Sequence, residues 1–221
     1  MRLWRRMFRY FERRRAARIA RALRAYFEPG DAVLDLGCGT LAVAQQIERH
    51  VPVRVIGLET IDYHRHAVPL VLYDGVHIPF RDQSFDVVLL AFVLHHCDDG
   101  GLALLRAALR LARKRIFVLE DRYDHAAERL WTRCLDRLLN GLEHAGVPTP
   151  CRFRSSAEWQ RVFCELGMET TAMRPLHTTP LVENRQLLFV LHPAASGTAA
   201  LSLQAEGAET FPPAPLRSDG R

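Results

Sequence analysis

The stretch VLDLGCGT, residues 33–40, decides the fold of this 221-residue chain. An apolar run of strand length ends there in an acidic residue and two glycines, and the segment that follows, LAVAQQIERH, has the apolar spacing of a helix. Strand-length and helical patterns alternate from this point to about residue 193. Alternation of this kind predicts an α/β fold with a doubly wound, mostly parallel sheet that is buried on both faces.

Seven apolar runs have the length and composition of strands. They are residues 32–36, 53–59, 68–74, 85–92, 115–121, 168–176 and 184–192. Helices are expected at residues 41–50, 101–113, about 125–144 and 155–166. Ser155 and Glu158 have the spacing of a capping box, which would start the last of these helices. We therefore expect a seven-stranded sheet with helices between its strands.

Composition excludes several classes of protein. Apolar residues make up 48% of the chain, which is enough for a buried core and excludes a wholly disordered or fibrous chain. The longest uncharged apolar stretches, such as residues 87–94, are far shorter than the roughly 20 residues that cross a bilayer. The five cysteines are widely spaced and include no C-x-x-C pair, which argues against zinc or a redox dithiol. We expect no metal site and a cytoplasmic protein.

Charge and composition divide the chain into three parts. Residues 1–28 hold ten arginines against Glu12 and Glu28, so they carry +8, while the rest of the chain sums to −3. Residues 29–193 should form the folded domain, and residues 194–221, rich in Ala, Gly, Ser and Pro, a disordered tail. A domain that binds nucleic acid needs basic groups on its main body, so no nucleic-acid partner is expected.

The basic segment, residues 1–28, has apolar residues at helical spacing and arginines on the other face. This pattern predicts an amphipathic helix, with a break near residues 13–15, that ends at the sequence Glu28-Pro29-Gly30-Asp31. Two interpretations of the helix can coexist: a lid over the sheet edge or a substrate pocket, and a weak peripheral contact with an anionic membrane. An Arg-rich, acid-poor leader also resembles an organellar transit peptide.

The residues that end each strand are the candidates for ligand binding, because ligands of a doubly wound sheet bind at the carboxyl ends of its strands. The first strand ends at Asp35, and Gly37 and Gly39 then let the backbone turn tightly and approach a ligand. The glycines alone also fit a dinucleotide. Asp35, however, would repel the pyrophosphate of a dinucleotide, whereas a carboxylate suits a ligand with an ammonium or sulfonium group.

A second acidic residue narrows the class of ligand. Glu59 ends the second strand, twenty residues after Gly39, where its side chain can accept both hydroxyls of a ribose. Together with Asp35 it indicates a nucleoside that carries a positive charge and no phosphates.

These segments, in this order, resemble the class I S-adenosylmethionine-dependent methyltransferases, especially the bacterial group often called type 11. The resemblance rests on VLDLGCGT at 33–40, Glu59, YDGVHIPFRDQSFDVVLLAFVLHH at 73–96 and LLRAALRLARKRIFVLED at 104–121. It covers about residues 31–193 and implies a Rossmann-like fold, S-adenosyl-L-methionine as cofactor, and methyl transfer to a small-molecule or lipid-like acceptor. It does not choose among oxygen, nitrogen, sulfur and carbon acceptors.

The resemblance also implies roles for individual residues. Its cofactor-binding positions are Asp35, Gly37, Gly39, Glu59, Thr60, Asp74, Gly75 and Ala91. Asp35 would lie near the methionine amino group, which the carbonyl of Ala91 would also reach. Thr60 would lie against the adenine, while the Asp74 carboxylate would accept from the adenine amino group and the Gly75 amide would reach a ring nitrogen.

His95 and His96 follow the fourth strand, at the edge where an acceptor would meet the methyl group. A neutral imidazole there can remove a proton from a hydroxyl or an amine, which makes both residues candidates for catalysis. The alternative is that they cap a helix or shape the pocket. Glu120 and Asp121 end the fifth strand on the same edge, and capping or structural duty is favoured for them over contact with the acceptor.

Two places depart from the family pattern. His77 lies in the segment before Pro79-Phe80, and we expect it to be a surface residue rather than a ligand. Residues 112–115, Ala-Arg-Lys-Arg, stand where relatives commonly have a Pro-Gly-Gly turn, so the turn before the fifth strand must be made without glycine.

Two alternative functions stand beside methyl transfer. The first is a non-catalytic methyltransferase-like protein that binds the nucleoside or acts as a scaffold, which the intact set of binding residues argues against. The second is an NAD-binding oxidoreductase, which Asp35 argues against.

Overall fold

The chain folds around a seven-stranded sheet in a computed structural model that describes residues 2–63, 65–121, 153–178 and 186–193. The strands are β1 (Ala32–Leu36), β2 (Arg54–Glu59), β3 (Leu70–Leu72), β4 (Phe85–Ala91), β5 (Ala112–Asp121), β6 (Met168–Leu176) and β7 (Gln186–Pro193). Their order across the sheet is β3-β2-β1-β4-β5-β7-β6, and β7 pairs antiparallel with both of its neighbours. The predicted mostly parallel, doubly wound sheet is confirmed.

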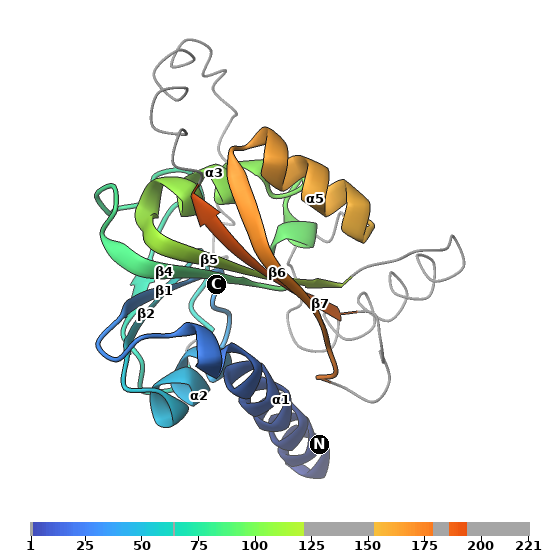
Figure 1. Ribbon diagram of the computed structural model, residues 1–221. Helices are drawn as coiled ribbons and strands as arrows, with labels where there is room; N and C mark the ends of the chain where they lie inside the picture. Colours follow the sequence, from blue (N-terminus) through green and yellow to red (C-terminus); the bar gives the residue numbers. More distant parts are fainter. Residues whose placement is uncertain (1, 64, 122–152, 179–185, 194–221) are drawn as a thin grey trace, which may run out of the picture.

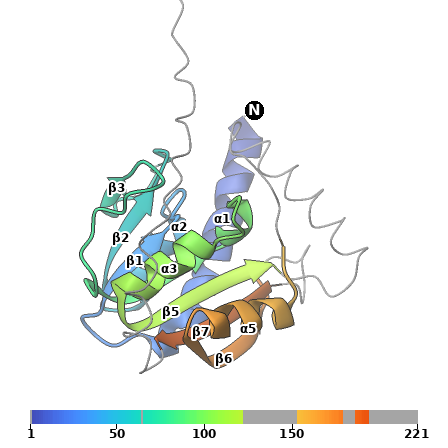
Figure 2. The ribbon, with the colours of Figure 1, turned by 90° about the horizontal axis from the view of Figure 1, so that it is seen from above.

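Helices cover both faces of the sheet (Figure 1). They are α1 (Arg2–Leu23), α2 (Ala42–His50), α3 (Leu102–Leu111) and α5 (Ser156–Glu165), with short 3-10 helices η1 (Arg24–Tyr26) and η2 (Leu94–His96). Successive residues of a buried strand face opposite sides, so Val33 of β1 packs with α1 and α2 while Leu34 packs with α3 and α5. Figure 2 shows β3 at one edge of the sheet and β6 at the other, beside α5.

α1 is continuous from Arg2 to Leu23, so the break predicted near residues 13–15 is wrong. Arginine has a high helix propensity, and Arg13 and Arg14 are exposed where no packing interrupts the backbone. The buried face of the helix consists of Ala16, Ile19, Ala20 and Leu23. The helix ends at Leu23 and η1 at Tyr26, shortly before the predicted Pro-Gly stop. The chain then turns at Gly30, which has a φ of +88°.

α5 begins with the predicted capping box. The Oγ of Ser155 accepts from the Glu158 amide at 3.3 Å, and the Glu158 carboxylate accepts from the Ser155 amide at 2.7 Å. These reciprocal bonds satisfy amides that would otherwise have no partner at the start of a helix.

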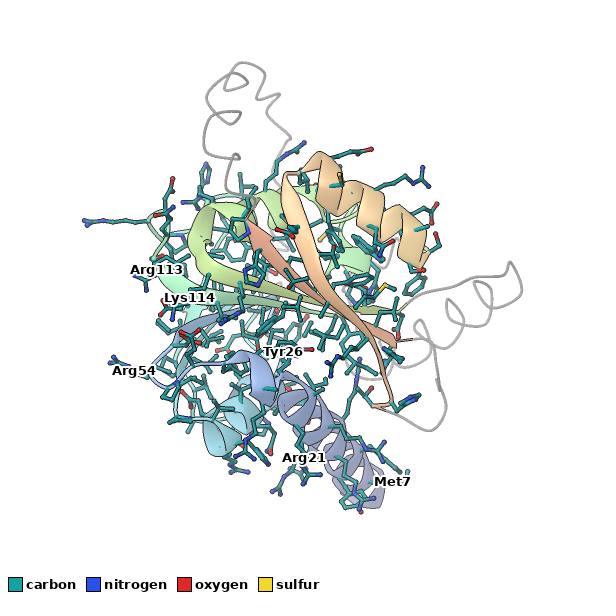
Figure 3. The ribbon with its side chains drawn as sticks, viewed as in Figure 1. Met7, Arg21, Tyr26, Arg54, Arg113 and Lys114 are labelled. Carbon is teal, nitrogen blue, oxygen red and sulfur yellow. The ribbon has the colours of Figure 1, made fainter. Side chains whose placement is uncertain are left out.

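The connection between α3 and β5 has no turn of its own. β5 begins at Ala112, directly after the last residue of α3, so the turn expected over residues 112–115 is absent and these residues are the first part of the strand. Lys114, at the amino end of β5, donates to Glu28 at 2.7 Å and to the buried Asp31 at 2.8 Å. These ion pairs join β5 to the segment before β1, on the side of the sheet where Figure 3 labels Lys114.

Two expectations fall outside the described residues. They are the helix at about residues 125–144 and the disordered tail at residues 194–221. Within the described ranges, no helix has both the length and the hydrophobicity that a membrane crossing requires.

Candidate active site

The carboxyl ends of β1, β2 and β5 bring together the acidic residues that the sequence singles out. Asp35 lies near the end of β1, Glu59 ends β2, and Glu120 is the second-last residue of β5. Asp35 is in register with Gly57 of β2 on one side and with Leu89 of β4 on the other. The strand order reverses between β1 and β4, so Asp35 occupies the point where a doubly wound sheet binds its ligand.

The loop after β1 turns at its two glycines. Gly37 has a φ of +76° and Gly39 a φ of +51°, a region that L side chains rarely adopt. A Cβ at Gly37 would lie 2.4 Å from Cγ2 of Val93, so only glycine fits beside the segment that follows β4. A Cβ at Gly39 would meet no atom within 4 Å. The loop is therefore closely packed at Gly37 and open at Gly39.

Asp35 is buried without a hydrogen-bond partner in the described part of the chain. The residue is 1% exposed, and neither oxygen of its carboxylate accepts a hydrogen bond from a described residue. Burial above all, and then the nearby charge of Glu59, raises the pKa of Asp35 to about 7. A buried polar group left unpaired is unfavourable by about 1–3 kcal/mol. Such a carboxylate is suited to a ligand that brings a positive charge.

Glu59 joins the end of β2 to the glycine loop. Its Oε2 accepts from the Gly39 amide at 2.9 Å, and its Oε1 accepts from the Thr60 amide at 2.8 Å. Gly39, Glu59 and Thr60, all predicted to bind the cofactor, thus form one network, in which Thr60 is exposed. Each carboxylate oxygen can accept more than one hydrogen bond, so Glu59 retains capacity for hydroxyl donors.

Asp74 and Gly75 form a turn next to Thr60. The Asp74 carboxylate accepts from the amides of His77 at 2.6 Å and Val76 at 2.8 Å, and its Oδ2 lies 2.7 Å from Nδ1 of His77. These bonds hold the pKa of Asp74 well below its usual range, and the bond from the His77 amide has the largest effect. A Cβ at Gly75 would lie 3.6 Å from Cγ2 of Thr60, so the predicted adenine contacts are close together.

His77 is exposed, as the sequence predicts, but the contact of its imidazole with the Asp74 carboxylate was not predicted. An aspartate followed by a glycine is a known signal for a turn stabilised by the aspartate side chain. That signal in the segment Asp74-Gly75 was present in the sequence and would have indicated that the carboxylate binds its own backbone.

α1 contacts the same edge of the sheet at two places. The Thr40 hydroxyl donates to Oε1 of Glu12 at 2.5 Å, and the guanidinium of Arg15 lies 4.1 Å from the ring centroid of Phe92. Thr40 directly follows the glycine loop and Phe92 directly follows β4. α1 is thereby joined to the segments that follow β1 and β4. The specific pairs have no sequence signature, because their members are far apart in the chain.

His95 is held in the core by Glu120. Nδ1 of His95 lies 2.6 Å from Oε2 of Glu120, and the other carboxylate oxygen accepts from the Leu94 amide at 2.8 Å. The side chains of His95 and Glu120 are only 2% and 1% exposed. The half-buried His96 lies beside them, with its ring centroid 4.1 Å from that of His95. Glu120 therefore has a structural role: it accepts from the first amide of η2 and fixes the imidazole of His95. Burial raises the pKa of the carboxyl of its neighbour Asp121.

The cysteines near this edge are not activated as nucleophiles. Burial raises the pKa of Cys97 to about 12, and burial also raises the pKa of Cys38. No group of three or more histidine, cysteine or acidic side chains could hold a metal ion within the described ranges.

Comparison with known proteins agrees with this geometry. Residues 34–118 match the model of a family described as a methyltransferase domain. An uncharacterized methyltransferase of Bacillus subtilis is 34% identical over 86 residues, which cover 39% of this chain and 32% of the relative. A demethylmenaquinone methyltransferase of Corynebacterium kroppenstedtii is 31% identical over 86 residues, which cover 37% of each protein. The chain thus spans about a third of the length of these curated relatives.

A solved structure extends the likeness beyond the matched segment. The structure of mitomycin 7-O-methyltransferase is similar over 81% of this chain and 53% of that one, with a TM-score of 0.63 and 18% sequence identity. At this identity the likeness shows the fold alone. The family match contains every residue predicted to bind the cofactor, as well as His95 and His96, and it ends before Glu120.

Proposed function

We propose that this chain, in which residues 34–118 match the model of a methyltransferase domain, is an enzyme that transfers a methyl group from S-adenosylmethionine to a small-molecule or lipid-like acceptor. The observation that carries the proposal is the buried carboxylate of Asp35, which accepts no hydrogen bond from the described residues. It lies where the strand order reverses, beside a loop that is open at Gly39. The relative named for demethylmenaquinone supports an acceptor of this class.

The side chains at this edge fit S-adenosylmethionine, which would supply an electrophilic methyl group on a sulfonium. Asp35 would accept from the ammonium of the methionine part, and the space at Gly39 would leave room for the ligand. Glu59 would accept the ribose hydroxyls while it keeps the glycine loop in place. Thr60 and Gly75 would lie against the adenine.

Two further residues complete the proposed cofactor site. Asp74 would accept from the adenine amino group with the lone pairs that its bonds to Val76 and His77 leave. Ala91, at the end of β4, would offer its carbonyl oxygen to the methionine ammonium. In this way the site would surround the ammonium with acceptors only.

The same acceptors disfavour the two alternatives. The pyrophosphate of NAD would meet the Asp35 carboxylate without a donor to offset the repulsion, which argues against an oxidoreductase. A non-catalytic scaffold would have no use for an imidazole that a buried carboxylate orients, and His95 is held in this way by Glu120.

His95 is the general base in this proposal, and Glu120 is the residue that positions it. With Glu120 as the acceptor, Nδ1 of His95 would be the donor of their hydrogen bond, and a proton from an acceptor hydroxyl or amine would go to Nε2, which is buried. His96 would contribute from beside it as a second imidazole at the acceptor. The sulfonium methyl is already electrophilic, so alignment of the acceptor and removal of its proton are the remaining tasks of the protein.

Ligand-induced thermal shifts test the cofactor. S-adenosylhomocysteine should raise the melting temperature of the full chain, because a ligand that binds the folded state stabilises it. NAD at the same concentration should not. A shift with NAD and none with S-adenosylhomocysteine would overturn the assignment.

Substitutions test the roles of the histidines. His95→Ala and His96→Ala should lower the turnover number more than they change cofactor affinity. Glu120→Gln should displace the pH profile of kcat, because the amide no longer stabilises a protonated imidazole. If both alanine variants kept the turnover number of the parent, the catalytic role would be withdrawn and a structural one retained.

A further inference from the structure

The N-terminal half of α1 exposes apolar side chains that the site does not use. Met7, Tyr10 and Phe11 are 42%, 53% and 51% exposed. Arg14 and Arg21 are also exposed. They lie on the same face of the helix, because residues three, four or seven positions apart point to the same side. These five residues are called the α1 stripe below.

The α1 stripe lies opposite the face that packs on the sheet. Each residue of a helix advances by about 100°, which places the stripe roughly 170° from the buried Ala16, Ile19 and Leu23. Figure 3 shows Met7 near the N-terminal end of α1 and Arg21 on the side turned away from the sheet. The exposed apolar residues are therefore not a continuation of the core.

The helix that bears the stripe is fixed to the body of the protein. Glu12 accepts from Thr40 at 2.5 Å, and the guanidinium of Arg18 donates to the carbonyl oxygen of Thr178 at 3.1 Å. Thr40 follows β1 and Thr178 follows β6, so α1 is held at two separated points of the carboxyl edge. The α1 stripe is thereby presented in one orientation relative to the candidate active site.

We propose that the α1 stripe docks on an anionic membrane surface. Apolar side chains bordered by arginines are typical of helices that lie in the headgroup region of a bilayer, and anionic headgroups complement the charge of the stripe. Glu12, the acidic residue in this part of the helix, is engaged by Thr40 on another face. A nucleic acid would pair with the arginines but leave the side chains of Met7 and Phe11 in water.

Docking of this kind has a consequence for the proposed function. Glu12 and Arg15 of the same helix contact Thr40 and Phe92 at the carboxyl edge of the sheet. A docked α1 would hold that edge within about one helix diameter, roughly 10 Å, of the leaflet. Such a distance suits a lipid-like acceptor, although membrane binding itself does not rest on methyl transfer.

Co-sedimentation of the full chain with vesicles tests the proposal. Vesicles with equal parts phosphatidylglycerol and phosphatidylcholine should bind at least about tenfold more tightly than phosphatidylcholine alone, and salt should weaken the binding. Arg14→Gln/Arg21→Gln should weaken it by about 25-fold, the product of about fivefold for each arginine at a membrane surface. Met7→Gln/Phe11→Gln should weaken it by at least about tenfold through lost apolar contact.

The matched control is Arg54→Gln/Arg106→Gln, which removes two charges from exposed positions outside α1. It should bind as the parent does, within about twofold. Each variant is first checked for the parent's helicity by circular dichroism.

Three outcomes would overturn the proposal. The first is equal binding to the two kinds of vesicle. The second is the same loss of binding in the control as in Arg14→Gln/Arg21→Gln, because net charge alone would then explain it. The third is unchanged vesicle binding by Met7→Gln/Phe11→Gln together with equally tight binding of poly(U) by the parent, which would mark a general polyanion surface.

Discussion

Asp31 and Asp35 are buried four residues apart, at the two ends of β1, and their surroundings are opposite in kind. Asp31 accepts from Nζ of Lys114 and from the Glu28 amide, both at 2.8 Å. Asp35 accepts from no described residue. The comparison teaches that this fold pairs a buried carboxylate where it connects elements of the structure, and leaves one unpaired where a ligand would bring the partner.

The contrast extends to the two edges of the sheet. At the amino edge, Asp86 forms an ion pair with Arg113, with 3.3 Å between Oδ1 and Nε, next to the pairs made by Lys114. At the carboxyl edge, Glu59 and Glu120 are held by backbone amides and an imidazole. The acidic side chains of the amino edge are therefore paired with lysine and arginine, whereas Glu59 and Glu120 at the carboxyl edge are held by amides and an imidazole.

The largest effect is expected from Asp35→Asn, which should stabilise the ligand-free protein at pH 8 by up to about 4 kcal/mol. The pKa of Asp35 is raised from 3.8 to about 7 by folding, so the unfolded chain ionises first as the pH rises. The parent should therefore lose stability between about pH 4 and pH 7 relative to the variant, and the difference should stay constant above that range.

Urea unfolding of both proteins at pH 5 and pH 8 measures this difference. The two pH values should give clearly different gaps in the free energy of unfolding between parent and variant. A gap that is the same at both would mean that Asp35 is not held in an unfavourable environment, and the contrast with Asp31 would fail.

Asp31→Ala should have the opposite sign and destabilise the protein by about 2–3 kcal/mol, because it removes charge-assisted hydrogen bonds from a buried site. The control is Asp82→Ala, which breaks the ion pair of the exposed Asp82 with Arg110 and should change the free energy of unfolding by less than about 0.5 kcal/mol. Equal effects of the two substitutions in urea unfolding would show that burial of Asp31 does not matter.

Glu59→Ala should weaken binding of S-adenosylmethionine by about 1–3 kcal/mol, since it removes the ribose acceptor and releases the Gly39 amide. Glu59→Gln, which can still accept from that amide, should lose less. Isothermal titration calorimetry gives both affinities. Wild-type affinity in Glu59→Ala would remove this residue from the site and confine the cofactor to the surroundings of Asp35.

The smallest effect is expected away from both edges, at the start of α5. Ser155→Ala removes the capping box and should lower the free energy of unfolding by about 1 kcal/mol. Affinity for S-adenosylmethionine should not change. A loss of affinity would show that the start of α5 contributes to cofactor binding as well as to stability, contrary to the proposed separation of the two.

The sequence was sufficient to predict the sheet and the residues at its carboxyl edge, because those signals are local. Asp35 and the glycines that follow it stand next to each other in the chain, and strand ends such as Glu59 follow from the alternation of patterns. The capping box at Ser155 is local in the same sense and has the predicted bonds.

Contacts between distant segments could not be predicted in this way. Lys114 is the single lysine of the chain, and the sequence alone does not indicate its ion-pair partner Asp31, because the two residues are 83 positions apart. The pairs that hold α1 to the carboxyl edge, such as Glu12 with Thr40, depend on the packing of the helix and not on a motif. The start of β5 was missed because residues 112–115 continue the polar spacing of a helix and contain no turn residue.

The account depends most on the claim that Asp35 is kept for a cationic ligand, and proton release on binding tests it most directly. Because burial raises the pKa of Asp35 to about 7, a fraction of the protein has Asp35 protonated at pH 7, and a bound ammonium would drive it to ionise. Calorimetric titration with S-adenosylmethionine at pH 7, in buffers of different ionisation enthalpy, should show release of a fraction of a proton per ligand that is absent in Asp35→Asn. Identical proton release by the parent and the variant would contradict the claim.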